Sequence, residues 1–294
     1  MAAPMLATLS RAFRSYAVVA PFLVFQLAAV KADSQAGRAG IDWWALQPVK
    51  RPDVPTFESE WARNDIDYFV LEKLAENNLT PSPLAEPRVL VRRLFFDLMG
   101  LPPTPEQIAQ FTADPSEAAY QQLVKDLLAS PHYGERWGRH WLDLARFGES
   151  DGFERNNVRE NQWHFRDWVI ESLNADMPYT EFARMQIAGD LIKPGKEGLA
   201  AAAFLTAGVH NNVVGGSEFM KRTARQDELE EIAGTVGQTF AGLTINCARC
   251  HDHKFDPVSQ KEYYQFVSAL NGVYHGDKDY LDPEIEARAT KTRE

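Results

Sequence analysis

The 294-residue chain contains only two cysteines, and this scarcity is its most informative compositional feature. Any thiol chemistry is therefore confined to one place. Basic residues are also few, since 31 Lys and Arg stand against 41 Asp and Glu and give a formal net charge of −10. A phosphate backbone would be repelled by this charge, and no basic stripe offsets it, so nucleic acid is not an expected partner.

Strand patterns, internal repeats and low-complexity tracts are absent as well. No stretch alternates apolar and polar residues for long, whereas apolar residues recur at helical spacing along most of the chain. We therefore expect an all-α fold, an irregular multi-helix domain that encloses its functional site. The predicted helices cover residues 64–77, 87–99, a short segment from 104, 116–129, 133–147, 162–173, 180–188, 197–209, 224–241 and 259–270.

The two cysteines lie in the sequence Cys247-Ala248-Arg249-Cys250-His251, which has the form C-x-x-C-H. Composition alone would produce this arrangement only on the order of once in several thousand draws. In c-type haem proteins, two such thiols add to the vinyl groups of the porphyrin and the adjoining imidazole binds the iron. We predict covalent haem c as the cofactor, tethered by Cys247 and Cys250, with His251 as the proximal iron ligand.

Two other chemistries could use the same residues. Reduced Cys247 and Cys250 could join His251 and His253 in a structural or binding zinc site, although the four ligands would then be crowded into seven residues. A redox disulfide is the other alternative, but that chemistry usually belongs to a thioredoxin-like βαβ context, which the pattern does not contain.

The N-terminus indicates export. Arg11 and Arg14 precede an apolar run from Tyr16 to Val30, which is short for a membrane span and is followed by a small-residue cleavage pattern. We predict a signal peptide over residues 1–32 and a periplasmic or otherwise exported protein, with membrane attachment only if the leader is uncleaved. Thioether attachment of haem is an export-side chemistry, so the leader and the cysteine motif agree.

The rest of the chain is expected to form three parts. Residues 33–57 are rich in Pro and Trp and should be extended. Residues 58–275 should form the helical haem-associated domain. Residues 276–294 form a polar C-terminal tail, interpreted as a truncated link to a missing domain.

The second ligand of the iron would decide between an electron carrier and an enzyme, because an open position allows small-molecule chemistry. His253 follows His251 on the same tether and cannot easily cross the porphyrin. His210, at the end of an apolar helix, is the leading candidate for the distal ligand. Its alternative role is that of a helix C-terminal histidine that interacts with terminal carbonyls. Lesser candidates are Met220, Met185 and His275.

A second group of polar residues could hold a polar substrate such as a carbohydrate. The alternative is an ion-paired helix face followed by a solvated loop. His140 is a candidate general base, and Asp190 is more typical of a cap or turn than of a catalytic acid. The group comprises Arg136, His140, Asp143 and Phe147 on one helix face, and Glu154, Arg155, Asn156, Asn157, Arg159 and Glu160 in the next loop.

Several motifs together resemble one known family, the planctomycete-type cytochrome-c-associated proteins of domain of unknown function 1549. The motifs are W-W-A-L-Q-P-V at 43–49, the stretch 94–103, W-L-D-L-A-R at 141–146, F-R-D-W-V-I at 165–170, A-G-D-L at 188–191 and C-A-R-C-H-D-H-K-F-D-P at 247–257. The resemblance covers about residues 42–275 and implies an exported protein with a haem c motif. Similar proteins usually continue into a second large domain, and many have a separate cytochrome module before the Trp-Trp segment; this chain has neither.

We therefore expect an exported monohaem protein that transfers electrons to a redox partner protein or within a larger redox enzyme. A haem oxidoreductase acting on a small polar substrate is the first alternative. A structural zinc or binding module is the second. Whether the chain is an enzyme is left open by the sequence.

Overall fold

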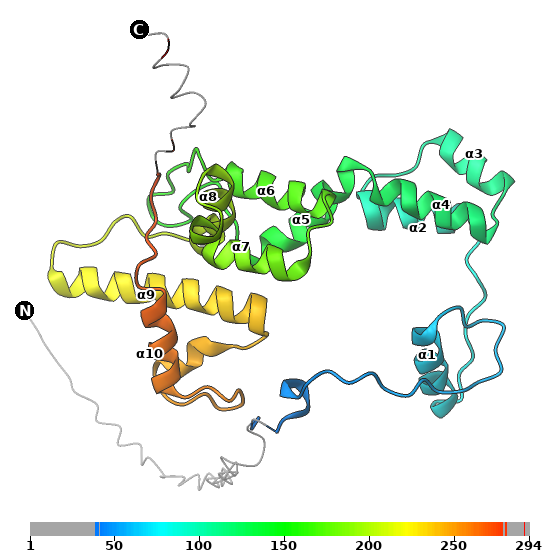
Figure 1. Ribbon diagram of the computed structural model, residues 1–294, viewed down its shortest axis with the longest axis horizontal. Coiled ribbons are helices and arrows are strands. Elements are labelled where there is room, and N and C mark those ends of the chain that lie inside the picture. Colours follow the sequence, from blue (N-terminus) through cyan, green and yellow to red (C-terminus); the bar gives the residue numbers. More distant parts are fainter. Residues whose placement is uncertain (1–38, 41, 279, 281–290, 292–294) are drawn as a thin grey trace, which may run out of the picture. The chain divides into compact units, whose positions relative to one another are not determined.

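The computed structural model describes residues 39–40, 42–278, 280 and 291 (Figure 1). By their contacts the residues divide into two units, 1–37 and 38–294, and the first lies outside the described part. The predicted signal peptide and the start of the extended segment therefore also lie outside it. No helix among the described residues combines the length and the apolar character that a membrane crossing requires.

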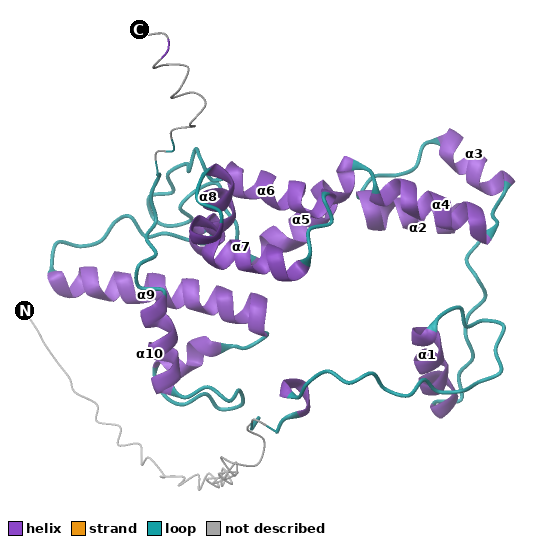
Figure 2. Ribbon diagram, viewed as in Figure 1, coloured by secondary structure: helices purple, strands orange, loops and turns teal. Residues whose placement is uncertain are grey.

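Helices make up all the regular structure in the described part, and no strand is present there (Figure 2). An isolated bridge between Ser150 and Val158 is the nearest approach to a sheet. The all-α prediction is confirmed. The α-helices are α1 (Asp65–Glu76), α2 (Pro87–Met99), α3 (Pro105–Ala113), α4 (Glu117–Leu128), α5 (Pro131–Leu144), α6 (Trp163–Asn174), α7 (Tyr179–Ile192), α8 (Lys196–Ala202), α9 (Glu218–Val236) and α10 (Gln260–Ala269). Four short elements join them: η1 (Trp44–Leu46), η2 (Ala203–Thr206), η3 (Gly237–Ala241) and η4 (Ile245–Arg249).

Local signals explain where most helices begin and end. Asn64 caps α1 by accepting hydrogen bonds from the backbone N–H groups of Ile66 and Asp67, as predicted. Gly100 ends α2 in the left-handed conformation at φ 71°, which glycine adopts without a steric penalty.

Several predicted boundaries are wrong: the helix expected over 133–147 ends at Leu144, and the one expected over 180–188 continues to Ile192. The helix expected over 197–209 is α8 followed by the 3-10 turn η2, and it ends at Thr206. The helix expected from 224 begins six residues earlier, because Ser217 caps it by accepting from the backbone N–H of Met220. The first turns of α9 are strongly charged, which hides the apolar period that a sequence reading relies on.

Three apolar clusters hold the helices together. The α2–α4 cluster is centred on Phe95 and Phe111. The central cluster joins α5 to α8 around Phe165 and Phe204. The α9–α10 cluster also includes η4. Leu205 of η2 packs against both the central and the α9–α10 cluster, so α9 is packed on more than one side.

The close crossing of α7 and α8 depends on glycine. A Cβ atom on Gly198 would lie 2.2 Å from the carbonyl oxygen of Gly189, which is far inside van der Waals contact. The two backbones can therefore touch only without a side chain at this point. This contact fixes the start of the segment that runs through η2 to His210.

The described residues of the Pro- and Trp-rich segment form only the short turn η1, and residues 47–57 have no helix or strand. At its start, the backbone N–H of Ala39 donates to the carbonyl oxygen of Phe255 at 2.6 Å. The prediction of an extended segment is therefore consistent with the part that is described.

Candidate functional site

The cysteine motif lies on the 3-10 turn η4 and the residues that follow it. A 3-10 helix has about three residues per turn, so residues i and i+3 lie on the same side. Ile245 and Ala248 are buried in the α9–α10 cluster, whereas Cys247 and Cys250 are both exposed, free thiols. The three-residue spacing thus places both sulfurs on the solvent side of one turn, with apolar side chains as the anchor beneath.

Arg249, between the two cysteines, ties the turn to the helices on either side. Its guanidinium pairs with Asp227 at 2.9 Å and with Glu230, both on α9. These two acids raise the pKa of Arg249 further above its usual value. Its carbonyl oxygen accepts from the side-chain amide of Gln260 at 3.0 Å and from the hydroxyl of Tyr264 at 3.2 Å, both on α10.

His251 has one ring nitrogen engaged and the other available. Its Nδ1 lies 2.7 Å from the carbonyl oxygen of Asp252. A carbonyl can only accept, so Nδ1 carries the proton and Nε2 keeps a lone pair. Metal-binding histidines are commonly oriented in this way, by donating the other N–H to a carbonyl or carboxylate. His251 is exposed, and its geometry suits an axial ligand.

His253 has a different role, because it is buried with 5% of its surface exposed. Its Nδ1 accepts from the backbone N–H groups of Phe255 at 3.2 Å and Asp256 at 2.7 Å, and its Nε2 lies 3.2 Å from Thr244 Oγ1. Asp256 in turn accepts from the backbone N–H and the hydroxyl of Thr244, each at 2.8 Å. Both ring nitrogens of His253 are therefore used to close the loop over residues 244–256.

Aromatic residues border the turn on its exposed side. Tyr264, whose hydroxyl donates to the carbonyl oxygen of Arg249, is 43% exposed, and Phe255, in the loop that follows the motif, is 57% exposed. Tyr263 faces inward, and burial together with the charge of Glu230 raises its pKa to about 12. Only part of the aromatic content near the motif is therefore available to a bound macrocycle.

These residues fit a covalently attached haem. The two cysteines are not joined in a disulfide, are exposed and lie on the same side of the turn, and no hydrogen bond engages Nε2 of the neighbouring imidazole. They fit a four-ligand zinc site less well, since both nitrogens of His253 are already used. Among the described residues, the single group of three or more ligand atoms within 4.8 Å of one another lies elsewhere, at His210, Glu228 and His275.

His210 lies in the loop after η2 and meets α9 from another side. Its Nδ1 is 3.1 Å from Glu228 Oε1, and its ring stacks on that of His275 at 4.3 Å between centroids. Glu228 and Glu230 are two residues apart on α9, which separates them by about 160° around the helix axis. Since Glu230 contacts the cysteine turn and Glu228 contacts His210, the two places lie on different faces of α9. The distal-ligand role of His210 stays a prediction.

His275 completes this group from the segment after α10. Its Nε2 is 3.5 Å from Glu228 Oε1, and its side chain is 9% exposed. Burial, followed by the positive charges of His210 and Arg159, lowers the pKa of His275 to about 4. We call His210, Glu228 and His275 the His–Glu–His cluster.

A buried ion pair beside this cluster was not foreseen from the sequence. Asp151 and Arg159 pair at 3.0 Å with side chains about one-tenth exposed, and Asp151 also accepts from the amide of Asn212 at 2.5 Å. Burial alone would raise the pKa of Asp151, but the hydrogen bonds from Arg159 and Asn212 hold it below its usual value. Arg159 also donates to the carbonyl oxygens of Thr206 and Gly208. No local motif signals these contacts, which join two loops.

The polar group predicted on α5 and the loop after it is not assembled into one site by any contact among the described residues. On α5, Arg136 lies over Gly100 and His140 packs edge-on against Trp137. In the loop, Arg159 forms an ion pair with Asp151, and the side chain of Glu154 is exposed.

No contact among the described residues joins the remaining candidates to the cysteine turn. Met185 is buried in the central cluster, and Met220 is half exposed at the start of α9, against Gly215. Asp190 is exposed near the end of α7.

Comparison with known proteins bears on the family alone. Residues 65–275 match the family described as protein of unknown function (DUF1549). No curated protein and no solved structure matches the chain. The match spans well over half of the 294 residues and includes the cysteine turn, α9 and the His–Glu–His cluster. It agrees with the resemblance carried by the W-L-D-L-A-R, A-G-D-L and C-x-x-C-H motifs, and the chain belongs to the DUF1549 family.

Proposed function

We propose that this chain is an exported monohaem protein of the c type whose task is electron transfer. Haem would be attached to Cys247 and Cys250 and ligated by His251. When bound, the haem supplies a one-electron iron couple. The observation that carries the proposal is the solvent-facing turn, on which two free thiols share one side and the adjoining imidazole keeps an unengaged Nε2.

The chain's own residues contribute rigidity at this place. Arg249 connects the turn to α9 and α10, and His253 with Asp256 closes the loop behind it. A turn held from both sides keeps the positions of the two sulfurs and the imidazole nearly constant. This favours a carrier, since a redox centre that changes little in shape needs little reorganisation when its charge changes.

Exposure supports electron transfer to a partner over chemistry in an enclosed pocket. Cys247, Cys250 and His251 are all exposed, and the half-exposed ring of Tyr264 is tied to the same turn. A partner protein, or a further domain of a larger redox enzyme, could approach this surface directly. A substrate site for an oxidoreductase would need a concave, water-excluding wall, whereas these three residues face solvent.

The test is expression of the full chain with haem-attachment machinery, followed by a pyridine haemochrome spectrum of denatured protein. We expect covalent haem in the parent and a shifted band in Cys250→Ala, which can form only one thioether. Tyr264→Phe is the matched control, because it leaves the thiols intact and should leave the band unchanged. Colourless protein whose zinc is lost in Cys247→Ser/Cys250→Ser would overturn the proposal in favour of the zinc module, and an unchanged band in Cys250→Ala would overturn the dual attachment.

A further inference from the structure

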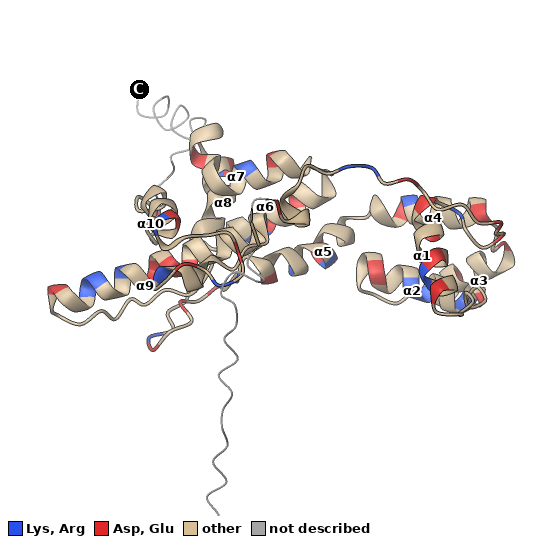
Figure 3. Cartoon of the chain, turned by 90° about the horizontal axis from the view of Figure 1, so that it is seen from below, with Lys and Arg blue, Asp and Glu red and all other residues tan. Residues whose placement is uncertain are grey.

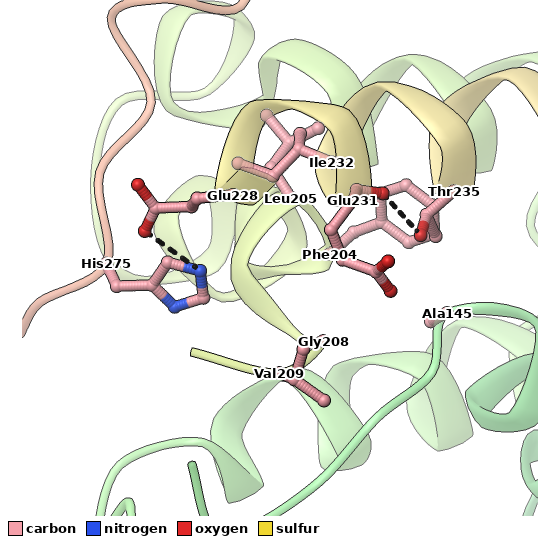
Figure 4. Close-up of a pocket in the computed structure, with 10 residues that line it drawn as sticks. All are labelled: Ala145, Phe204, Leu205, Gly208, Val209, Glu228, Glu231, Ile232, Thr235 and His275. Atoms are coloured by element: carbon pink, nitrogen blue, oxygen red, sulfur yellow. Dashed lines mark hydrogen bonds and ion pairs between the residues drawn. The ribbon is translucent and has the colours of Figure 1, made fainter. Parts of the chain in front are cut away.

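The His–Glu–His cluster brings together three segments that are far apart in the sequence. His210 comes from the loop after η2, Glu228 from α9, and His275 from the segment after α10. Figure 4 shows Glu228 and His275 facing each other across the gap between α9 and the C-terminal segment. The chemistry proposed for the cysteine turn makes no use of these residues.

The spacing of the three ligand atoms suits a metal ion. In a tetrahedral zinc site with bonds of about 2.0–2.1 Å, neighbouring ligand atoms are about 3.3–3.4 Å apart. Here His210 Nδ1 and His275 Nε2 lie 3.1 Å and 3.5 Å from the same oxygen, Glu228 Oε1. The longer of these separations exceeds the usual range of a hydrogen bond. The three ligand atoms all lie within 4.8 Å of one another, close enough to reach one shared ion.

Outer contacts hold the carboxylate and the C-terminal segment in place. Arg225 pairs with the second oxygen of Glu228, Oε2, which leaves Oε1 to the histidines. The same guanidinium donates to the carbonyl oxygens of Asn271 at 2.9 Å and Val273 at 2.6 Å, two residues before His275. Metal-binding carboxylates are typically oriented by such outer hydrogen bonds.

His210 is held independently by its backbone. Its N–H donates to the carbonyl oxygen of Asp151 at 2.9 Å, and the Asp151 side chain is fixed by the buried pair with Arg159. The loop is therefore anchored on both sides of the ligand, since Arg159 also binds the carbonyl oxygen of Gly208. The position of His210 is therefore set by backbone contacts of its loop, and that of His275 by the hydrogen bonds from Arg225 to the preceding residues.

A small cavity adjoins the cluster. It is lined by Glu228 and His275 together with Gly208, Val209 and Ile232, and it has about 10 Å³ of space for water (Figure 4). That is room for about one water molecule. A three-ligand ion needs one further ligand of this size to reach four-coordination.

We propose that His210 Nδ1, Glu228 Oε1 and His275 Nε2 bind one divalent first-row transition-metal ion of the zinc type, with water as the fourth ligand. A two-histidine, one-carboxylate set with an open position is the kind used by catalytic zinc and by non-haem iron. The site is separate from the cysteine turn, so it stands or falls independently of haem attachment.

The test uses the full chain, stripped with a chelator and titrated with zinc chloride by calorimetry, with bound metal counted by mass spectrometry. We expect one zinc per chain and an upward shift of the thermal unfolding midpoint. Glu228→Gln and His275→Ala should weaken binding by more than the about 10- to 100-fold typical of losing an outer contact. His132→Ala is the matched control, because His132 pairs with Glu135 at 2.8 Å on α5 with no third ligand.

Two results would overturn the proposal. One is the absence of stoichiometric zinc and of any thermal shift in the unmodified protein, a measurement that does not depend on whether a variant folds. The other is zinc that persists in Glu228→Gln but disappears in Cys247→Ser/Cys250→Ser, which would place the metal at the thiols. The same titration with ferrous iron under nitrogen decides which ion the ligand set prefers.

Discussion

The two faces of α9 border two different groups of residues, the cysteine turn and the His–Glu–His cluster. The cysteine turn is made of five consecutive residues, whereas the His–Glu–His cluster spans 66 positions from His210 to His275. The turn is exposed and anchored by Arg249, while the cluster is partly buried and depends on two loops and a C-terminal segment. Figure 3 shows both acidic and basic residues along α9, and acids on this helix serve both places. The cysteine turn should therefore tolerate changes in distant packing. The same changes should disrupt the His–Glu–His cluster, because it is assembled from three separate segments.

The largest expected effect is complete loss of covalent haem in Cys247→Ser/Cys250→Ser. No thioether can form without either thiol. Both cysteines are exposed, so the free energy of unfolding should change by no more than about 0.5 kcal/mol. Haem staining after denaturing electrophoresis and chemical denaturation measure the two quantities. Zinc binding at the cluster should remain, and its loss would show that the two faces of α9 are not independent.

The second effect is on stability, in Asp151→Ala. Removal of one partner from a buried ion pair leaves Arg159 uncompensated and costs about 3–5 kcal/mol. The affinity of the His–Glu–His cluster for metal should also fall in this variant, because the carbonyl oxygen of Asp151 holds the backbone of His210. Urea denaturation gives the free energy of unfolding, and Glu154→Ala in the same loop, with an exposed side chain, is the control. Equal stabilities for the two variants would contradict the role given to the pair.

A smaller effect should appear as a pH dependence of stability. The pKa of Asp151 is lowered in the folded protein, so the unfolded chain binds more protons in acid. The stabilisation from the pair is therefore complete above the unfolded-state value of about 3.9 and is lost as pH falls through the lower folded value. Denaturation curves between pH 7 and pH 3 measure this slope. Asp151→Asn should flatten it, and an unchanged slope in that variant would assign the acid sensitivity to other carboxyl groups.

The smallest effect is expected in the haem spectrum of His210→Ala. The side chain faces Glu228 on the other side of α9 from Arg249, so the spin state of the iron should stay as in the parent while zinc affinity falls. The reduced and oxidised absorption spectra report the spin state. A change from low to high spin would instead establish His210 as the distal ligand, as the sequence reading predicts, and would remove it from the cluster.

The comparison also separates what could be foreseen from what could not. The helix that Asn64 caps and the one that Gly100 ends were predictable, because capping and apolar periodicity act within a few residues. The start of α9 was missed because charged residues fill its first turns. The inward role of His253 was also invisible, since it depends on the backbone N–H groups of Phe255 and Asp256 in a loop whose shape no pattern encodes.

The helical class and the grouping of two thiols with an imidazole in one turn are encoded locally, because both follow from spacings of a few residues. The meeting of His210, Glu228 and His275, and the burial of Asp151 and Arg159 as a pair, instead depend on how distant segments pack. Those contacts arise when η2, α9 and the segment after α10 pack around shared apolar residues such as Leu205. The free energy for such packing comes from burial of nonpolar surface, which is non-directional, so no local motif records which polar groups it brings together.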